Sequence, residues 1–228
     1  MLMKKFAVIV AGGNGQRMGS LIPKQFLLLK QKPLLWYSIN SFLKAYADLE
    51  IILVLPEEHL ERGELLRSSF TALDRIRIIQ GGATRFHSVQ KGLSLVAEDS
   101  IVFVHDGVRC LVSNDLIVRC YEQALSKGSA IPAVAATDSI RMVNKEGTVV
   151  ANRNDVRLIQ TPQTFKSEIL LPAFKKEYHS SFTDEATVVE ASGNRIFLVE
   201  GEYQNIKITR PIDLMIAEKI LDDTLFFE

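Results

Sequence analysis

Short apolar runs alternate along the first half of the chain with segments whose apolar residues recur every three or four positions. The runs predict strands buried on both faces of a sheet. They lie at residues 6–10, 51–55, 76–79 and 101–104. The recurring segments predict helices. They lie at 34–46, 57–68, 84–96 and 114–126, the last with Ser113 or Asn114 as its N-cap. Such alternation indicates right-handed βαβ units around a mostly parallel sheet.

The second half of the chain is less regular. A further apolar run at 130–134 is followed by two β-prone segments, 140–143 and 148–151, which flank turn residues at 144–147. This pattern predicts a hairpin that projects as an arm. Helices are expected at 167–178, at 183–192 before Gly193, and from Pro211 onward, with a strand at 195–199. The whole predicts one domain, 1–228, with a Rossmann-like three-layer α/β fold, a mostly parallel central sheet and a projecting β-hairpin arm at about 138–154.

Charge and composition narrow the possible partners. The 228 residues carry 27 Lys and Arg against 27 Asp and Glu, a net charge of zero, which argues against a nucleic-acid partner and a polybasic membrane contact. No apolar run approaches the ~20 residues of a membrane span, and the first apolar stretch runs into a glycine loop, so we interpret it as a strand. Two cysteines, Cys110 and Cys120, and four scattered histidines favour a reduced cytoplasmic protein without a zinc site.

A glycine loop after the first strand is the sharpest chemical signal. It runs from Ala11 to Gly19 and is followed by Pro23-Lys24-Gln25. It lacks the Gly-Lys-Ser/Thr of a P-loop, and Met18 stands where a dinucleotide fingerprint needs a small residue. Glycine amides with Arg17 and Lys24 suit phosphate oxygens, so we favour a phosphate site over a glycine turn with solvated cations.

Further motifs occur in order along the chain. They are Gly81-Gly82-Ala83-Thr84-Arg85-Phe86-His87-Ser88-Val89, Val104-His105-Asp106-Gly107-Val108-Arg109, Asp138-Ser139 with Arg153-Asn154, Gln160-Thr161-Pro162-Gln163, Phe182-Thr183-Asp184-Glu185-Ala186 and Asn205-Ile206-Lys207-Ile208-Thr209-Arg210-Pro211. With the glycine loop, they resemble the polyol-phosphate cytidylyltransferases, and most closely the 2-C-methyl-D-erythritol 4-phosphate cytidylyltransferase family. The resemblance covers almost the whole chain. It departs at Cys110, where the family usually has Pro, and at Gly12, where many members have Ala.

The resemblance implies cytidylyl transfer from CTP to 2-C-methyl-D-erythritol 4-phosphate in non-mevalonate isoprenoid synthesis. Arg17 and Lys24 would stabilise the transition state. The residues expected at CTP are Ala11, Gly12, Gly13, Gly15, Gly82, Ala83, Arg85, Ser88 and Gly107. Those expected at the polyol phosphate are Asp106, Arg109, Ser139, Arg153, Thr183 and Lys207. Mg²⁺ or another divalent cation would accompany CTP, with Asp106 near it or bound to it. The arm would reach across a homodimer, so that Ser139 and Arg153 serve the partner's site.

Less specific interpretations stand beside these assignments. Arg85 is also consistent with an ordinary surface arginine, and Ser88 with an ordinary helix serine. Asp106 is also consistent with a carboxylate that caps a turn and pairs with Arg109. Lys207 is also consistent with a solvated lysine at the end of a strand. Two alternative functions stay open: a ribitol-5-phosphate cytidylyltransferase, and a nucleotide-binding regulatory module without turnover. We expect six cations to converge on one pocket or its dimer-completed rim, with the acids other than Asp106 elsewhere. These cations are Arg17, Lys24, Arg85, Arg109, Arg153 and Lys207.

Overall fold

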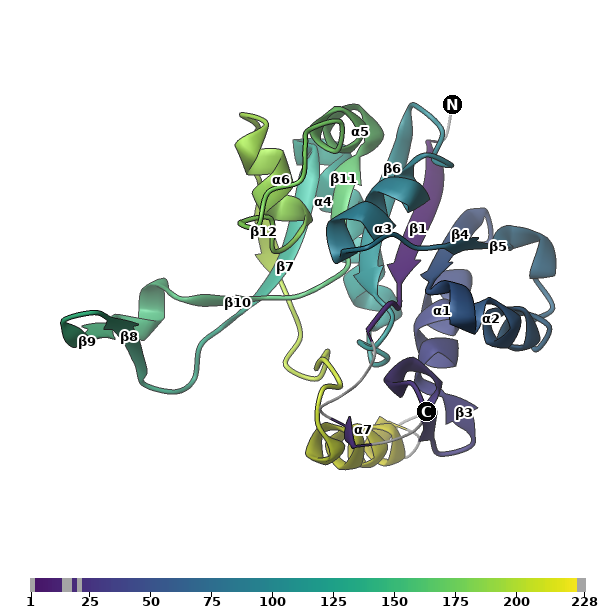
Figure 1. Cartoon of the computed structure of the whole chain (residues 1–228), viewed down its shortest axis with the longest axis horizontal. Helices are drawn as coiled ribbons and strands as arrows, with labels where there is room; N and C mark the ends of the chain where they lie inside the picture. The colour runs from purple at the N-terminus through teal and green to yellow at the C-terminus, as the bar shows by residue number, and fades with distance from the viewer. Residues whose placement is uncertain (1–2, 14–17, 20–21, 225–228) are drawn as a thin grey trace.

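A twisted sheet with helices on both faces forms the body of the molecule (Figure 1). The computed structural model describes residues 3–13, 18, 19 and 22–224. Its main sheet has eight strands in the order β10-β7-β11-β6-β1-β4-β5, with β12 paired to β7. The strands are β1 Lys4–Val10, β4 Leu49–Leu55, β5 Ile76–Gln80, β6 Ser100–Asp106, β7 Ser129–Ala135, β10 Arg157–Ile159, β11 Gln163–Lys166 and β12 Leu198–Glu200. Strands β10 and β11 are antiparallel to their neighbours, and the other pairings are parallel. The predicted α/β fold with a mostly parallel sheet is confirmed.

Alternate residues of the central strands face two separate cores, because successive side chains of a strand point to opposite faces. In β1, Ala7 and Ile9 pack on one face and Phe6, Val8 and Val10 on the other. Helices α1 Leu34–Ala45, α2 Leu60–Arg67 and α4 Asn114–Lys127 cover the first face. Helices α3 Arg85–Leu93, α5 Ser167–Ala173 and α6 Glu185–Ala191 cover the second. The central strands β1, β4 and β6 are therefore apolar on both sides, as their sequences predict.

The C-terminal helix lies apart from these two layers. Helix α7 Pro211–Thr224 packs near a small hairpin, β2 Leu28–Leu29 with β3 Lys32–Pro33, which follows a short 3₁₀ turn, η2 Lys24–Phe26. Leu29, Leu34 and Ile208 are buried in this third core. Figure 1 shows α7 below the sheet. This packing anchors the segment before α7, which carries Lys207, beside the end of the sheet.

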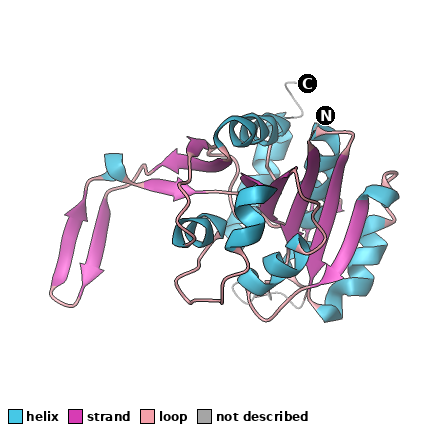
Figure 2. Ribbon diagram, turned by 90° about the horizontal axis from the view of Figure 1, so that it is seen from above, coloured by secondary structure: helices cyan, strands magenta, loops and turns pink. Residues whose placement is uncertain are grey.

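The predicted arm is confirmed as a hairpin. Strands β8 Ile140–Asn144 and β9 Gly147–Ala151 form their own two-stranded sheet and extend away from the body (Figures 1 and 2). The backbone N–H of Glu146 donates to the side chain of Asn144 at 3.0 Å, and Gly147 has a φ of +133°, which suits glycine at this tight turn. A 3₁₀ turn, η5 Arg153–Asp155, follows the hairpin and leads back toward the sheet.

Several predicted elements are shorter or divided. The helix expected at 167–178 ends at Ala173, because Pro172 lies inside it and Phe174 turns to stack on Phe86 with ring centroids 4.9 Å apart. The helix expected at 57–68 divides into a 3₁₀ turn, η3 Glu57–His59, and α2. Another 3₁₀ turn, η4 Leu73–Arg75, precedes β5. Ser113 is the N-cap of α4, accepting from the N–H of Leu116 at 3.0 Å. Among the described residues, no helix is both long and apolar enough to cross a membrane.

Candidate active site

A cavity of about 820 Å³ opens where the central parallel strands end. The ends share one edge because Val10 of β1 lies opposite Val54 of β4 and Asp106 of β6, and Leu55 of β4 lies opposite Gln80 of β5. Open α/β sheets bind ligands at this carboxyl edge. The predicted site residues that line the cavity are Ala11, Gly12, Gly13, Lys24, Gly82, Ala83, Arg85, Ser88, Asp106 and Lys207.

One wall of the cavity is the glycine segment after β1. The N–H of Ala11 continues the ladder by donating to the carbonyl of Val54 at 3.0 Å, while Gly12 and Gly13 are exposed. A Cβ at Gly13 would lie 3.1 Å from Cε and 3.6 Å from Nζ of Lys24, so the lysine chain lies directly over this backbone. The structure therefore joins Lys24 to the glycine segment, as the motif predicts. Gly15 and Arg17 lie outside the described residues.

The opposite wall is the turn from β5 into α3. Ser88 accepts from the N–H of Gly82 at 3.1 Å and donates to the carbonyl of Thr84 at 3.0 Å, which fixes the turn. A Cβ at Gly82 would come within 2.4 Å of Cβ of His87, so only glycine fits there. The backbone of Gly82 and Ala83 is left at the cavity surface, where its amide and carbonyl groups can meet a flat base or a ribose.

A chain of four charged side chains crosses the floor of the cavity. Asp106 pairs through one carboxylate oxygen with Nζ of Lys207 at 2.7 Å and through the other with Nε of Arg85 at 3.1 Å. The guanidinium of Arg85 then forks onto both oxygens of Glu185, at 2.5 and 3.0 Å. The side chain of Glu185 is 1% exposed. This chain joins the end of β6, the first turns of α3 and α6, and the segment before α7.

These contacts correct two expectations. Arg85 lines the cavity as predicted, but its Nη1 and Nη2 atoms donate to Glu185 and its Nε donates to Asp106. In this structure Arg85 therefore orients Asp106. The acids were also expected elsewhere, yet Glu185 is buried beside Asp106, and Glu57 and Glu58 line the cavity. The Glu185 carboxylate is buried and needs a cationic partner, which the half-buried Arg85 supplies.

The network keeps Arg85 and Asp106 charged, whereas burial raises the pKa of Glu185 above its ordinary value. Burial alone would lower the pKa of Arg85, but the carboxylates of Glu185 and Asp106 raise it above its ordinary value. Burial alone would raise the pKa of Asp106, but Arg85 and Lys207 hold it well below its usual range. Asp106 is therefore an anion at neutral pH, and the arginine beside it is a cation.

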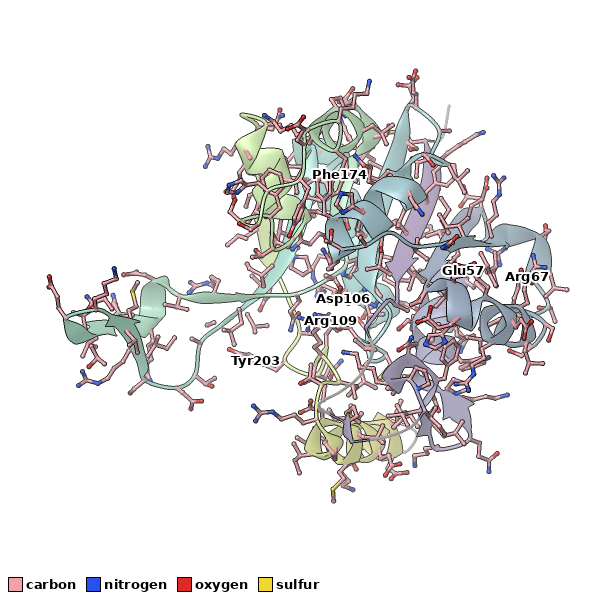
Figure 3. All side chains as sticks on the ribbon, viewed as in Figure 1. Glu57, Arg67, Asp106, Arg109, Phe174 and Tyr203 are labelled. Carbon is pink, nitrogen blue, oxygen red and sulfur yellow. The ribbon has the colours of Figure 1, made fainter. Side chains whose placement is uncertain are left out.

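Arg109 lies beside this network, one turn after Asp106 (Figure 3). Its Nη1 donates to the carbonyl of Asn205 at 2.8 Å and its Nη2 to that of Ile159 at 3.3 Å. Burial lowers the pKa of Arg109, and the nearby Asp106 opposes this effect. Its Nε is buried with no hydrogen-bond partner among the described residues, and Arg109 lies beside the cavity without lining it.

Gly107 has a packing role that the motif did not reveal. Its N–H donates to the carbonyl of Val10 at 2.9 Å, and an added Cβ would lie 2.7 Å from Leu35 and 3.1 Å from the Cβ of Ala11. Glycine here lets the turn after β6 approach the end of β1. It thereby sets the spacing between Asp106 and the glycine segment.

The remaining predicted residues do not line the cavity. Ser139 and Arg153 are exposed at the root of the arm, where Arg153 donates to the carbonyl of Thr137 at 3.0 Å. Thr183 is exposed just before Asp184, whose side chain caps α6 in a capping box with Thr187. One copy of the chain thus brings together Lys24, Arg85, Asp106 and Lys207 but not the arm residues. Glu185 was missed as a site residue, although its position in the Phe182–Ala186 motif was the signal for it.

The donors present suit Mg²⁺ bound mainly by a substrate. No group of three His, Cys, Asp or Glu side chains is arranged to hold a metal within the described part of the chain. Asp106 supplies one carboxylate at the cavity, and Mg²⁺ commonly takes one or two carboxylates together with phosphate oxygens and water. The site therefore fits a cation that arrives with a triphosphate.

A glycine segment, a lysine over it and a fixed carboxylate at the carboxyl edge of an α/β sheet define a protein of the nucleotidyltransferase class. The family model for 2-C-methyl-D-erythritol 4-phosphate cytidylyltransferase matches residues 5–223. The chain belongs to that family.

Individual relatives agree over nearly full length. The 2-C-methyl-D-erythritol 4-phosphate cytidylyltransferase of Phocaeicola vulgatus is 44% identical over 219 residues, covering 96% of this chain and 100% of that protein. The crystal structure of 4-diphosphocytidyl-2C-methyl-D-erythritol synthase from Anaerococcus prevotii has a TM-score of 0.82 at 25% identity, covering 96% of this chain and 99% of its own. The Francisella tularensis cytidylyltransferase structure has a TM-score of 0.78 at 32% identity, covering 95% and 99%.

Proposed function

We propose that the chain transfers the cytidylyl group of CTP to 2-C-methyl-D-erythritol 4-phosphate, giving 4-diphosphocytidyl-2-C-methyl-D-erythritol and pyrophosphate for isoprenoid synthesis. The observation that carries this proposal is the cavity in which Gly13 and Lys24 face the Asp106–Lys207 pair, within a chain that matches the family from residue 5 to 223. The cavity of about 820 Å³ is large enough for a nucleotide.

The reaction needs positioning and charge stabilisation more than proton transfer. A phosphate oxygen of the polyol phosphate attacks the α-phosphorus of CTP, and pyrophosphate leaves. Because the nucleophile is already an anion, no general base is required. The barrier comes from bringing two polyanions together, which Lys24 and the glycine amides offset by holding phosphate oxygens. Arg17 is assigned the same role by its motif.

Two subsites follow from the walls of the cavity. The exposed backbone of Gly82 and Ala83, with Ser88 behind it, suits the cytosine and ribose. Lys207 and Arg109, on either side of Asp106, supply cationic groups for the polyol phosphate, and the Asp106 carboxylate can accept hydrogen bonds from its hydroxyls. Thr183 lies at the outer edge of this second subsite in the proposal.

Mg²⁺ or another divalent cation is part of the proposal. Bound to triphosphate oxygens near Asp106, it would neutralise charge on CTP and the leaving pyrophosphate. Asp106 is the residue that would hold it or orient its water. Loss of pyrophosphate release on treatment with EDTA, restored by excess Mg²⁺, is the expected result.

The arm supports a homodimer. Met142 and Val149 on one face of the hairpin are 62% and 52% exposed, and Val143 and Val150 on the other are 81% and 71% exposed, so a monomer would leave these apolar side chains in water. Ser139 and Arg153 lie at the root of this hairpin, and in a dimer with exchanged arms they would reach the partner's polyol phosphate. A cytoplasmic location, with small-molecule substrates only, completes the proposal.

A single assay tests the function. Purified protein is incubated with CTP, Mg²⁺ and either 2-C-methyl-D-erythritol 4-phosphate or ribitol 5-phosphate, and pyrophosphate release is followed. Release with the erythritol substrate, at least about tenfold faster than with the ribitol one, supports the proposal. Preference for ribitol 5-phosphate would contradict it, and release with neither would leave a nucleotide-binding module.

A further inference from the structure

His105 is the last residue but one of β6 and is completely buried, next to the charged network but outside it. Its Nε2 lies 3.2 Å from the carbonyl oxygen of Arg109, and its Nδ1 lies 3.1 Å from Oγ1 of Thr161. A carbonyl oxygen can only accept, so Nε2 carries the proton. Nδ1 of a neutral ring is then an acceptor, and the hydroxyl of Thr161 must donate to it.

These two bonds belong to a closed ring of four residues. His105 donates to the carbonyl of Arg109, and Arg109 donates through Nη1 to the carbonyl of Asn205 at 2.8 Å. Asn205 donates through Nδ2 to the carbonyl of Thr161 at 2.9 Å, and Thr161 donates back to His105. Each residue gives one side-chain hydrogen bond to the next. His105 and Asn205 are 0% exposed and Thr161 is 5% exposed, so water cannot easily replace a missing member.

The ring surrounds residues that face the second substrate in the proposed function. Asp106 and Arg109 lie on the turn that His105 closes, and the N–H of Asp106 donates to the same hydroxyl of Thr161 at 3.0 Å. Lys207 follows Asn205 by two residues and pairs with Asp106. The nucleotide wall at Gly82–Ser88 has its own bonds through Ser88 and Thr84. The ring therefore bears most directly on the polyol phosphate subsite, and it reaches the nucleotide wall only through the pair of Asp106 with Arg85.

Packing alone does not account for a histidine here. The ring of His105 contacts Phe42 edge-on, with centroids 5.2 Å apart, and a leucine or phenylalanine could fill the same space. An apolar side chain would leave the Arg109 carbonyl with only the longer bond from the N–H of Val112, at 3.4 Å, and would remove the acceptor that orients the Thr161 hydroxyl. The hydrogen-bonding pattern selects a neutral imidazole.

We propose that His105 is a positioning residue that closes this ring as a neutral, Nε2-protonated imidazole and thereby sets the place of Arg109 and Lys207 for the polyol phosphate. This inference rests on the proposed function for the identity of the second substrate. It adds a residue that touches no substrate and acts through Arg109, Thr161 and Asn205.

Three variants of His105 distinguish its two hydrogen bonds, the one donated to Arg109 and the one accepted from Thr161. His105→Leu removes both hydrogen bonds. His105→Gln places an amide near Nε2 and keeps the donation to Arg109, whereas His105→Asn places one near Nδ1 and keeps only the acceptor for Thr161. We expect the leucine variant to raise KM for the polyol phosphate about tenfold or more, the scale of leaving one buried group unpaired, with KM for CTP within about twofold. His105→Gln should raise KM for the polyol phosphate much less than His105→Leu does, and His105→Asn should raise it by an amount between the two.

Phe42→Leu is the matched control, since it perturbs the packing of the same ring and leaves its hydrogen bonds intact. It should lower stability without a selective rise in KM for the polyol phosphate. Equal losses from Phe42→Leu and His105→Leu, equal losses from Gln and Leu, or equal rises in both KM values would overturn the proposal.

Nitrogen-15 NMR of histidine-labelled wild-type protein gives a test that needs no substrate and no folded variant. At pH 7.5 the His105 ring should show a protonated Nε2 and an unprotonated Nδ1. An Nδ1–H tautomer or an imidazolium would refute the ring. Wild-type protein that turns over neither polyol phosphate would instead count against the proposed function, and the tautomer would still decide whether the ring exists.

Discussion

The cavity and the arm differ in whether their side chains are partnered within the same chain. At the cavity, Asp106 is paired with Lys207 and Arg85, and Arg85 is paired with the buried Glu185. On the arm, Val143 is 81% exposed and Val150 is 71% exposed. The charged side chains at the cavity are paired within a single copy, whereas the arm leaves apolar side chains exposed.

The cavity residues are preorganised within one chain, whereas in the proposed homodimer the arm residues depend on assembly with a second chain. Charged groups that are held before substrate arrives need little rearrangement during the reaction, which favours catalysis. The exposed apolar hairpin gains stability only when another surface covers it, and this ties its residues to a second copy. Changes at the cavity should therefore act within one chain, and changes on the arm should depend on protein concentration.

The largest effect is expected from a substitution that breaks the charge network. Glu185→Leu leaves the half-buried Arg85 with Asp106 as its remaining carboxylate partner and should lower the free energy of unfolding by about 2–4 kcal/mol. Urea denaturation followed by circular dichroism measures it. The double variant Arg85→Met/Glu185→Leu should recover much of the loss, and Glu61→Leu on the exposed face of α2 should change little. A loss below about 1 kcal/mol would show that the pair is not buried as described.

The next effect concerns turnover rather than stability. Lys24→Ala removes the cation over Gly13 and should lower kcat by about 10²–10³, the scale for one preorganised charge-stabilising group. Steady-state pyrophosphate release measures it, with Lys44→Ala, exposed on α1, as the control. Arg17→Ala is expected to behave like Lys24→Ala. Wild-type turnover in a folded Lys24 variant would remove lysine from the proposed mechanism.

The sequence predicted the cavity better than the network inside it. Apolar runs located β1, β4, β5 and β6, and their parallel order placed the glycine segment and Asp106 at one edge. The pairing of Arg85 with Glu185 joins residues 100 positions apart, and no local pattern encodes such a contact. Only the fold shows that Arg85 is directed at a carboxylate.

Strand β11 was missed for a related reason. Its residues Gln163 and Thr164 are polar, so the segment lacks the apolar pattern of a buried strand. They are nevertheless 1% and 0% exposed. The amide of Gln163 donates to Asp184 at 2.9 Å and accepts from the N–H of Ala186 at 2.8 Å, which satisfies it inside the protein. Hydrogen bonds to distant residues thus replace the hydrophobic signal that sequence patterns detect.

A charge on the arm tests its apolar surface. Val143→Asp should weaken a homodimer by roughly tenfold to thirtyfold in Kd, since burying one valine contributes about 1.5–2 kcal/mol. Analytical ultracentrifugation over a range of concentrations measures the shift. Leu65→Asp changes a leucine of α2 that is 75% exposed and serves as the control on the body. If the wild-type protein sediments as a fully active monomer, the arm does not assemble the site.

The smallest effect sharpens the link between arm and cavity. Arg153→Ala should raise KM for the polyol phosphate by about tenfold, the lower end for a charge-assisted hydrogen bond, and change KM for CTP little. Arg141→Ala, on the hairpin itself, is a matched control because Arg141 contacts Thr148 within the arm at 3.1 Å. Mixing Lys24→Ala protein, which has an intact arm, with Arg153→Ala protein, which has an intact cavity, should restore part of the activity at low polyol phosphate concentration, because under arm exchange a mixed dimer holds one site with an intact cavity and the partner's intact arm. If each arm serves its own chain, every site in the mixture lacks either Lys24 or Arg153, and activity should equal the average of the two separate proteins. Activity clearly above that average would support exchange, and activity at the average would place Arg153 at its own chain's cavity and refute exchange.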